Sequence, residues 1–592
     1  MRSLLRLIPV LRIYRFQIGA SFFAFFVARF FEISAYFLVS MGIDSIQQVI
    51  ENATPEYSIG QVALGIVCCV LMRFIVVIYA RRGLRRVGFA VSYDLRQSLF
   101  SKVQQQGSEF FARMGVGDIM TRAIQDIALI QRLIAFGSFG IVIMVYAPFF
   151  AIIAMIYKSP SLTVLILPVL PIIFLYGWKM SGAMADSSLA MQEGLSALTT
   201  HTQENLSGIR TVQAQAQEQN EIKRFWVTND QYATAFYDQA RINSLMTAWM
   251  PWLASAAQLM IIIYGGNLVL ENQLSVGDLI FFLACLNMLL QPIRMAGMLV
   301  TMVQRGAVAT RRLFEIFDAK PEIIDNPSGL TPDIISGDFE LKHLGYTYPG
   351  ASEPALQDIN LRIHRGESIG IVGRVGSGKS TLLKHFTRML DSSDGQLLVD
   401  DIDVKSYPLR QIRRQIAQVL QDPFLFAEPL RNNISYDDPD RTLELVWGSA
   451  ESAALKETIL EFPEQLDTLV GERGVTLSGG QKQRTTLARG FIRDAPVLIL
   501  DDCFSSVDTE TEEHILSRLK SLRDDRTTIL VSHRVSTLRH SDRIIVMDEG
   551  SIAESGTHEE LLALDGLYAE LERLQTPGAD SDRSQDMELS PV

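Results

Sequence analysis

Cysteine, histidine and tryptophan are scarce in this chain, whose 592 residues include four cysteines, eight histidines and five tryptophans. The cysteines have no spacing that suits a disulfide framework or a zinc site, so they are interpreted as small buried apolar side chains: Cys68, Cys69, Cys285 and Cys503. Basic residues are in deficit, because the net charge is −12. No nucleic-acid partner is expected for such a chain.

Apolar residues are in excess, at 48% of the chain, and the long apolar runs lie before residue 306. A helix needs about 20 apolar residues to cross a bilayer core. Six segments are long enough: residues 17–40, 60–80, 133–157, 161–181, 247–270 and 278–302. The first is expected to be retained, since no small-residue cleavage site follows it. The sequence therefore predicts an all-α transmembrane domain of six helices in the lipid bilayer, residues 1–320.

Arginines lie on one side of the first two spans. Four precede the first span and five lie within residues 81–96, whereas the loop between the spans, residues 41–59, carries only acidic charges. By the positive-inside rule, both termini are cytoplasmic. The long segments 81–132 and 182–246 are then cytoplasmic helical extensions. Within them, GVGDIMTRAIQD (115–126) and SGIRTVQAQAQEQNEIKRF (207–225) either face a cytoplasmic domain or are solvated hairpins without a partner.

Charged side chains occur inside two predicted spans, where each costs about 2.5 to 3.5 kcal/mol on insertion scales. Arg29 and Glu32 are three residues apart, on one face of the first helix, and Arg73 lies in the second. They form a compensated structural pair or line a polar translocation cavity. In the sixth span, four methionines suit an adaptable binding surface or packing against lipid: Met288, Met295, Met298 and Met302.

A phosphate-binding loop is predicted in the charge-rich second half. The strand-like ESIGIV leads into GRVGSGKST and then a helical pattern, which satisfies GxxxxGK[ST] in its strand–loop–helix context. In such a loop, backbone N–H groups surround the phosphates of ATP, Lys379 reaches the β and γ oxygens, and Ser380 binds magnesium. The residues expected at the nucleotide are Gly373, Gly376, Ser377, Gly378, Lys379, Ser380 and Thr381.

Two further motifs complete the predicted nucleotide site. In VLILDD, Asp501 ends an apolar strand and is the expected Mg²⁺ carboxylate. In GVTLSGGQKQR, four residues lie at a predicted helix start, where N–H groups and the helix dipole favour an anion: Ser478, Gly479, Gly480 and Gln481. An α/β P-loop NTPase domain is predicted over residues 336–576, after a linker, 321–335, and before a disordered acidic tail, 577–592.

LSGGQ resembles the signature motif of ATP-binding cassette (ABC) transporters. Tyr348 in GYTYPG is similar to the family's adenine-stacking aromatic residue, and SSVD (505–508) resembles its D-loop. Gln421 resembles the Q-loop glutamine, which senses the γ-phosphate and which the resemblance also places at the metal ion. His533 resembles the switch histidine. Six spans before one cassette resemble exporter half-transporters of the multidrug and lipid-A flippase type, over about residues 1 to 575. The resemblance implies a dimer in which two cassettes enclose two ATP molecules, each between the Walker residues of one chain and the signature of the other.

Asp502 departs from the family pattern, because it stands at the catalytic glutamate position. The pKa values of the two residue types differ by only a fraction of a unit. Reach differs more, since one C–C bond is about 1.5 Å and a 1 Å error can cost about a hundredfold in rate. The resemblance gives catalytic roles to Asp502, His533 and Gln421.

The paired aspartates resemble those of MdlA-like subunits. The sequence therefore predicts one half of a heterodimeric exporter of a hydrophobic or amphipathic drug or lipid, in a bacterial inner membrane, with a degenerate Walker site of its own. The alternatives are a homodimer that uses Asp502 as a slow base and a nucleotide-binding regulatory protein without transport.

Overall fold

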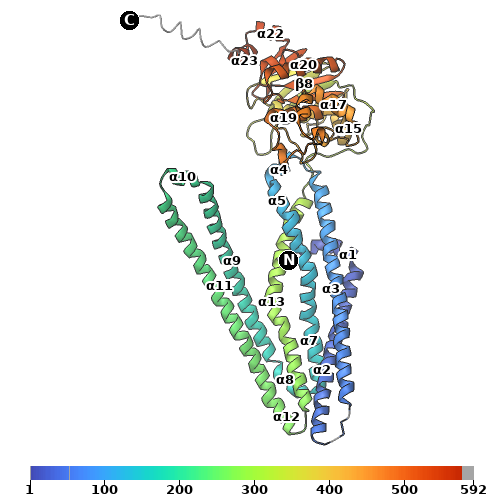
Figure 1. The fold of residues 1–592 in the computed structure, drawn as a ribbon, viewed down its shortest axis with the longest axis vertical. Coiled ribbons are helices and arrows are strands. Elements are labelled where there is room, and N and C mark those ends of the chain that lie inside the picture. The colour runs from blue at the N-terminus through green and yellow to red at the C-terminus, as the bar shows by residue number, and fades with distance from the viewer. Residues whose placement is uncertain (1, 53, 56, 576–592) are drawn as a thin grey trace. The chain divides into compact units, whose positions relative to one another are not determined.

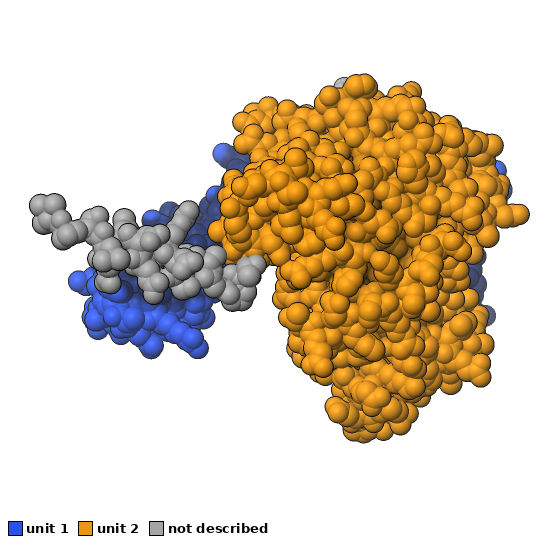
Figure 2. All heavy atoms as spheres, turned by 90° about the horizontal axis from the view of Figure 1, so that it is seen from above, with its two compact units in different colours: residues 1–105, 114–319 blue, residues 106–113, 320–592 orange. Residues whose placement is uncertain are grey.

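The computed structural model describes residues 2–52, 54–55 and 57–575 (Figure 1). The predicted tail, residues 577–592, lies outside the described residues. The chain forms two compact units, coloured in Figure 2: residues 1–105 with 114–319, and residues 106–113 with 320–592. The second unit therefore includes a short segment from the first half of the chain.

The first unit is helical throughout. Its α-helices are α1 (Ile8–Ile13), α2 (Arg15–Ile50), α3 (Ile59–Val103), α5 (Val116–Thr121), α6 (Ile127–Arg132), α7 (Ser138–Lys158), α8 (Pro160–Ile166), α9 (Val169–Ser207), α10 (Ile209–Ala214), α11 (Glu218–Met260), α12 (Gly266–Leu270) and α13 (Val276–Phe317). Short π-helical turns join α5, α6 and α7 into one continuous helix, and α11 and α12 into another.

Six helices of the described chain are long and apolar enough to cross a membrane. They are Arg15–Ile50, Ile59–Val103, Val116–Lys158, Pro160–Ser207, Glu218–Leu270 and Val276–Phe317. Each contains one of the predicted spans, so the six-span prediction is confirmed. The cysteine prediction is confirmed for Cys285 and Cys503, which are buried. Cys69 is half-buried, and the prediction is wrong for Cys68, which is exposed on α3 because this helix turns an apolar surface outward.

Helices α9 and α11 lie side by side and, with α10 at their tip, diverge from α2, α3 and α7 (Figure 1). α10 falls within the predicted stretch 207–225 and buries none of its residues in this chain. The tip of the hairpin formed by α9, α10 and α11 is therefore exposed on the surface of the unit.

The intramembrane charges form one cluster. Arg29 and Glu32 are buried and hydrogen-bonded to each other, and Arg73 lies 2.9 Å from the second carboxylate oxygen of Glu32. One carboxylate thus lies between two guanidinium groups. This arrangement favours the interpretation of a compensated structural cluster.

The second unit contains two sheets. Its strands are β1 (Phe339–Tyr346), β2 (Leu356–Ile363), β3 (Ser368–Gly373), β4 (Leu397–Val399), β5 (Ile402–Asp403), β6 (Ile416–Val419), β7 (Val497–Asp501), β8 (Thr527–Val531), β9 (Arg543–Asp548) and β10 (Ser551–Gly556). One sheet is antiparallel, in the order β2-β1-β4-β5, and the other has the order β10-β9-β3-β8-β7-β6, parallel except at β10.

Helices cover these sheets. They are α14 (Lys379–Phe386), α15 (Leu409–Gln415), α16 (Leu430–Ile434), α17 (Leu443–Ser452), α18 (Lys456–Glu461), α19 (Gly479–Phe491), α20 (Thr509–Leu522), α21 (Val535–Leu538), α22 (His558–Ala563) and α23 (Leu567–Gln575). Strand β3 is buried on both faces, since Ile371 packs in one core cluster and Val372 in the other. Such burial explains why residues 369–372, IGIV, are apolar without alternation.

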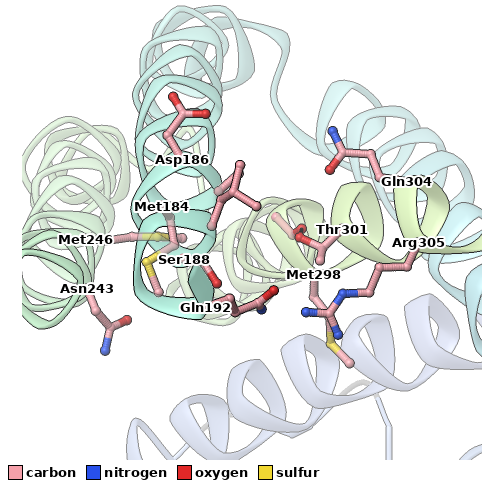
Figure 3. Close-up of a pocket in the computed structure, with 13 residues that line it drawn as sticks. Met184, Asp186, Ser188, Gln192, Asn243, Met246, Met298, Thr301, Gln304 and Arg305 are labelled. Carbon is pink, nitrogen blue, oxygen red and sulfur yellow. Dashed lines mark hydrogen bonds between the residues drawn. The ribbon is translucent and has the colours of Figure 1, made fainter. Parts of the chain in front are cut away.

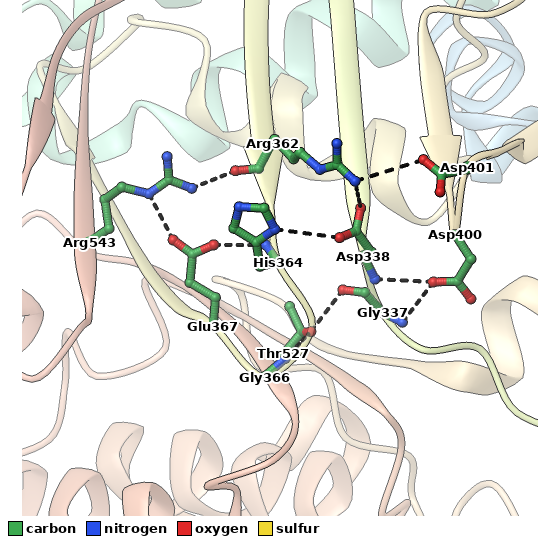
Figure 4. A network of polar contacts seen from close by, with 10 residues as sticks. All are labelled: Gly337, Asp338, Arg362, His364, Gly366, Glu367, Asp400, Asp401, Thr527 and Arg543. Atoms are coloured by element: carbon green, nitrogen blue, oxygen red, sulfur yellow. Dashed lines mark hydrogen bonds and ion pairs between the residues drawn. The ribbon is translucent and has the colours of Figure 1, made fainter.

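A polar network joins the two sheets (Figure 4). The hydroxyl of Thr527, at the start of β8, donates to the Gly337 carbonyl at 2.8 Å and accepts from the Gly366 amide at 3.2 Å. Arg543 on β9 donates to Glu367 at 2.7 Å, and Arg543 also donates to the backbone carbonyl of Arg362 on β2 at 2.5 Å. These bonds fix the sheets at the edge where β3 begins.

A short helix from the first half of the chain belongs to the second unit. Helix α4 (Ser108–Met114) buries Phe110, and Glu322 accepts the backbone N–H groups of Glu109 at 3.3 Å and Phe110 at 2.6 Å. The predicted stretch 115–126 instead begins the next long helix. The docked segment therefore lies just before the predicted one, because Gly115, with φ +69°, ends α4.

The predicted linker is bound to the cassette. The carboxylate of Asp325 accepts the Leu409 amide at 2.7 Å, and Gln415 binds the Pro332 carbonyl at 3.2 Å and the Ile335 amide at 2.5 Å. Residues 321–335 therefore pack along the second unit rather than hanging free from it.

Candidate nucleotide-binding site

The loop between β3 and α14 needs glycine at defined positions. Gly376 and Gly378 have φ of +87° and +97°, in the left-handed region that favours glycine. A Cβ on Gly378 would also lie 2.6 Å from the Ala355 carbonyl oxygen. The motif glycines therefore let the backbone turn tightly at the N-terminus of α14, where N–H groups can face an anion.

Lys379 begins α14 and is buried beneath this loop. Its ammonium donates to the carbonyls of Gly373 and Arg374, each at 2.8 Å, and lies 3.4 Å from the Ser377 hydroxyl. Burial lowers the pKa of Lys379, while Asp502 and then Asp501 oppose that shift. A loop folded around a buried cation is an arrangement suited to phosphate.

Asp501 is the last residue of β7 and is buried. Burial first, and the charge of Asp502 second, raise the pKa of Asp501 to about 6. A divalent cation would hold such a carboxylate ionised. Ser380 adds a hydroxyl at the start of α14, and oxygen donors of this kind suit Mg²⁺, which takes few protein ligands and keeps water and phosphate oxygens. The residues present thus fit a magnesium ion.

The three predicted catalytic residues lie together. Gln421 donates to one carboxylate oxygen of Asp502 at 3.2 Å, and the His533 backbone N–H faces the other at 3.5 Å. The Nε2 atom of His533 is 3.9 Å from Asp502, whose side chain is 12% exposed. The Asp502 backbone has φ +44°, a left-handed conformation that aspartate tolerates better than most residues.

Tyr348 lies beside the phosphate-loop helix. Its hydroxyl shares a 3.2 Å hydrogen bond with Thr381, and its ring meets Tyr346 edge to face at 5.0 Å. Tyr346 in turn donates to Glu109 of α4 at 3.3 Å. The predicted adenine-stacking residue is therefore braced between the P-loop helix and the segment docked from the first half of the chain.

The signature residues form the start of α19. Ser478 is the N-cap: its hydroxyl accepts the Gln481 N–H at 3.3 Å, and the Gln481 side chain accepts the Ser478 N–H at 2.9 Å. Gly479 is the first helical residue, and a Cβ on Gly480 would lie 2.8 Å from the Ser506 carbonyl oxygen. The signature is therefore packed against the D-loop.

Gln483 is a site residue that the sequence motifs do not reveal. It is buried, donates to the Ser505 hydroxyl at 2.7 Å, and accepts the Ser506 N–H at 2.7 Å. The only signal in the sequence is its position two residues after Gln481, which does not reveal that it binds the D-loop.

The membrane unit contains a cavity of about 580 Å³ among α9, α11 and α13 (Figure 3). Met298 lines it together with Met184 and Met246, and Asp186 and Arg305 supply charge. Of the methionines singled out in the sixth span, Met288 is instead buried in the core, so the four do not form one surface.

Comparisons with known proteins agree with this geometry. Residues 18–293 match the family described as the ABC transporter transmembrane region, and residues 356–505 match the ABC transporter family. The chain is 32% identical over 519 residues to the ABC transporter ATP-binding protein YknU of Bacillus subtilis, covering 87% of this chain and 88% of YknU. The chain is an ABC transporter. A bacterial Atm1-family ABC exporter with ATP bound shares its fold, with a TM-score of 0.71 at 23% identity, covering 96% of this transporter and 100% of that chain.

Two further relatives carry functional names. The transporter is 34% identical over 496 residues to the ATP-dependent lipid A-core flippase of Syntrophus aciditrophicus, covering 83% of this chain and 81% of the flippase. It is 33% identical over 488 residues to YgaD of Bacillus subtilis, provisionally named a multidrug export ATP-binding/permease protein, covering 82% and 84%. The transporter is thus a multi-pass, ATP-driven membrane protein, and one transmembrane region followed by one cassette is the organisation of a half-transporter.

Proposed function

We propose that this chain is one half of a heterodimeric exporter and that its own Walker site binds ATP with Mg²⁺ but hydrolyses it slowly. The observation that carries the proposal is the short carboxylate at Asp502, in an otherwise complete set of cassette motifs. Gln421 and the His533 N–H each bind one oxygen of Asp502. In this proposal, the carboxylate of Asp502 is one C–C bond too short to orient the attacking water well.

In the proposed site, each residue has a defined task. Tyr348 stacks on adenine, the phosphate loop with Lys379 holds the phosphates, and Ser380, Asp501 and Gln421 hold Mg²⁺. His533 contacts the γ-phosphate. With Asp502 too short to orient water well, these residues bind and enclose ATP without rapid cleavage, and the closed cassette acts as a clamp.

The signature residues serve the partner's site in this proposal. Ser478 and Gln481 cap the helix start reciprocally, and the N–H groups of Gly479 and Gly480 in its first turn can donate to a phosphate. The glutamate needed there would come from the partner. The uncovered α10, which buries none of its residues within the chain, supports a partner on that side.

The proposed substrate is a hydrophobic or amphipathic drug or lipid. The cavity of about 580 Å³ combines methionines with one acid and one base, which suits an adaptable surface for amphipathic molecules. The names of YgaD and of the lipid A-core flippase point to the same two classes. We place the protein in a bacterial inner membrane with both termini cytoplasmic, on the arginines that flank the first two spans.

The alternative is a homodimer in which Asp502 serves as a slow base. One observation favours it: Gln421 and His533 remain beside Asp502, so the catalytic arrangement is retained apart from reach.

Purification of the tagged chain from native membranes distinguishes the heterodimer from the homodimer. The heterodimer predicts an equimolar second half-transporter, identified by mass spectrometry, whose sequence has glutamate at the position of Asp502. Recovery of this chain alone, in a complex of two copies that turns over ATP, would establish the homodimer instead.

A further inference from the structure

The segment that contains the switch histidine, residues 532–540, contacts α23, the last helix that the structure describes. Gln575, the last residue of α23, donates through its side-chain amide to the His533 carbonyl at 2.7 Å and accepts the Val535 N–H at 2.9 Å. One side chain thus binds the backbone on both sides of Arg534.

These two bonds satisfy one backbone carbonyl and one backbone N–H at the start of α21. α21 has only four residues, and its N-cap, Arg534, makes no side-chain capping bond. The first amides of a helix need an acceptor from outside the helix. Gln575 supplies one to Val535, so a residue of α23 acts as the cap of α21.

His533 is consequently held at both ends of its backbone. Its N–H faces Asp502 at 3.5 Å, and its carbonyl binds Gln575 at 2.7 Å. Its imidazole is left free to turn only about the side-chain bonds and is 42% exposed. Asp502 on one side and Gln575 on the other therefore fix the backbone from which the His533 side chain projects toward Asp502.

The rest of the segment is fixed by a different element. Arg534 donates to the buried Glu512 of α20 at 2.8 Å, and Thr537 also donates to Glu512. These contacts hold residues after His533 but do not reach its carbonyl. Gln575 therefore supplies a constraint that the buried network does not.

Helix α23 is itself anchored firmly. Tyr568 is fully buried and its hydroxyl lies 2.7 Å from His558, while Glu554 accepts the N–H groups of Leu567 at 2.6 Å and Tyr568 at 3.1 Å. Further along α23, Glu570 lies 3.3 Å from Arg374 of the phosphate loop. The same helix thus contacts both the phosphate loop and the segment that contains His533.

We propose that Gln575 is a positioning residue: through its two hydrogen bonds, the C-terminal helix sets the direction of the switch histidine. The role follows from backbone contacts within one cassette, so it holds for the heterodimer and for the homodimer alike.

The test uses the full-length chain with Gln575→Ala, Gln575→Glu and the control Leu574→Ala, whose side chain is exposed on the same helix. Deuterium exchange of the peptide containing residues 532–540 should be faster in Gln575→Ala by roughly two- to tenfold, the factor expected from one lost neutral hydrogen bond. Gln575→Glu keeps an acceptor for Val535 but sets a carboxylate against the His533 carbonyl, so it should slow exchange relative to alanine. Leu574→Ala should match the wild type.

Turnover supplies the second readout. In an Asp502→Glu background, both Gln575 variants should lower kcat by a similar roughly two- to tenfold factor with the KM for ATP unchanged. Unchanged exchange in Gln575→Ala would overturn the proposal, and this readout does not depend on whether the own site hydrolyses. Faster exchange with an unchanged kcat would also overturn it, because Gln575 would then serve stability alone.

Discussion

Ser478 combines a structural and a chemical role at the residue scale. Its hydroxyl caps α19, and in the proposed dimer it also contacts the phosphate bound by the partner. Ser478→Ala removes both, and loss of a cap costs about 1 kcal/mol. Ser478→Asn keeps a capping side chain but not the hydroxyl. We expect both variants to reduce ATP turnover of the complex more than Lys379→Ala does, since in the proposed dimer the signature serves the competent site.

The measurement is turnover of the purified complex at saturating Mg-ATP, with thermal unfolding as a control. Ser478→Asn should keep the wild-type unfolding temperature. Complete loss of turnover in Lys379→Ala, with mild loss in both Ser478 variants, would reverse the proposed asymmetry.

Glu32 is the only acid of the intramembrane charge cluster. Glu32→Ala would leave Arg29 and Arg73 without their shared carboxylate, and breaking a buried pair in this way costs about 3 to 5 kcal/mol. We expect a clear fall in the yield of folded protein in membranes, measured by size-exclusion chromatography.

The matched control for Glu32 is Arg73→Ala. This variant leaves the buried pair of Arg29 and Glu32 intact, and the side chain of Arg73 is 43% exposed, so its yield should stay near the wild type. Normal yield of Glu32→Ala with a changed substrate profile would favour a cavity-lining role.

Motif residues were predictable one at a time, because their chemistry depends on local sequence. The phosphate loop requires glycines at positive φ and a lysine at the helix start, and both requirements are visible in GRVGSGKST. Gln483 and Gln575 were not predictable in this way. Each acts on a loop that is distant in sequence, and only the folded chain brings the partners together.

At the scale of elements, Gln483 connects the signature helix α19 to the D-loop. Gln483→Ala would remove the acceptor of the Ser506 N–H, at a cost of about 0.5 to 1.5 kcal/mol. Gln483→Glu can still accept from Ser506 and from the Ser505 hydroxyl. We expect the alanine variant to lose turnover of the complex while its own site keeps its affinity for ATP, and the glutamate variant to retain most activity.

Fluorescent-nucleotide binding and turnover on the same preparation test this expectation. An equal loss of affinity and turnover in Gln483→Ala would mean that the D-loop contact supports the whole cassette rather than the signature.

Most elements followed from periodicity and length, but their contacts did not. Long apolar runs are sufficient for six spans, since a bilayer imposes a fixed length. The docked helix α4 lies just before the predicted stretch, residues 115–126. The sequence did not locate it, because a helix-periodic pattern continues on both sides of Gly115. Its contacts with Glu322 join residues more than two hundred positions apart, which no local pattern reports.

At the scale of the whole molecule, the chain would contribute its Walker residues to one nucleotide site of the proposed dimer and its signature to the other. Its signature is intact and capped, whereas its own Walker site has every motif residue except a carboxylate of full length. The proposed dimer of two different halves would use both parts, with one site as a clamp and the other as the site of hydrolysis.

Replacement of Asp502 by glutamate tests this account most directly. The measurement is the ATP turnover of the purified chain alone, wild type against Asp502→Glu, at saturating Mg-ATP. We predict slow turnover in the wild type and a rise in the variant of tenfold or more, up to about a hundredfold, as reach is restored. The left-handed backbone at Asp502 limits the gain, since glutamate adopts that conformation less readily. Wild-type turnover of about 1 to 10 per second, or a variant no faster than the wild type, would contradict the account.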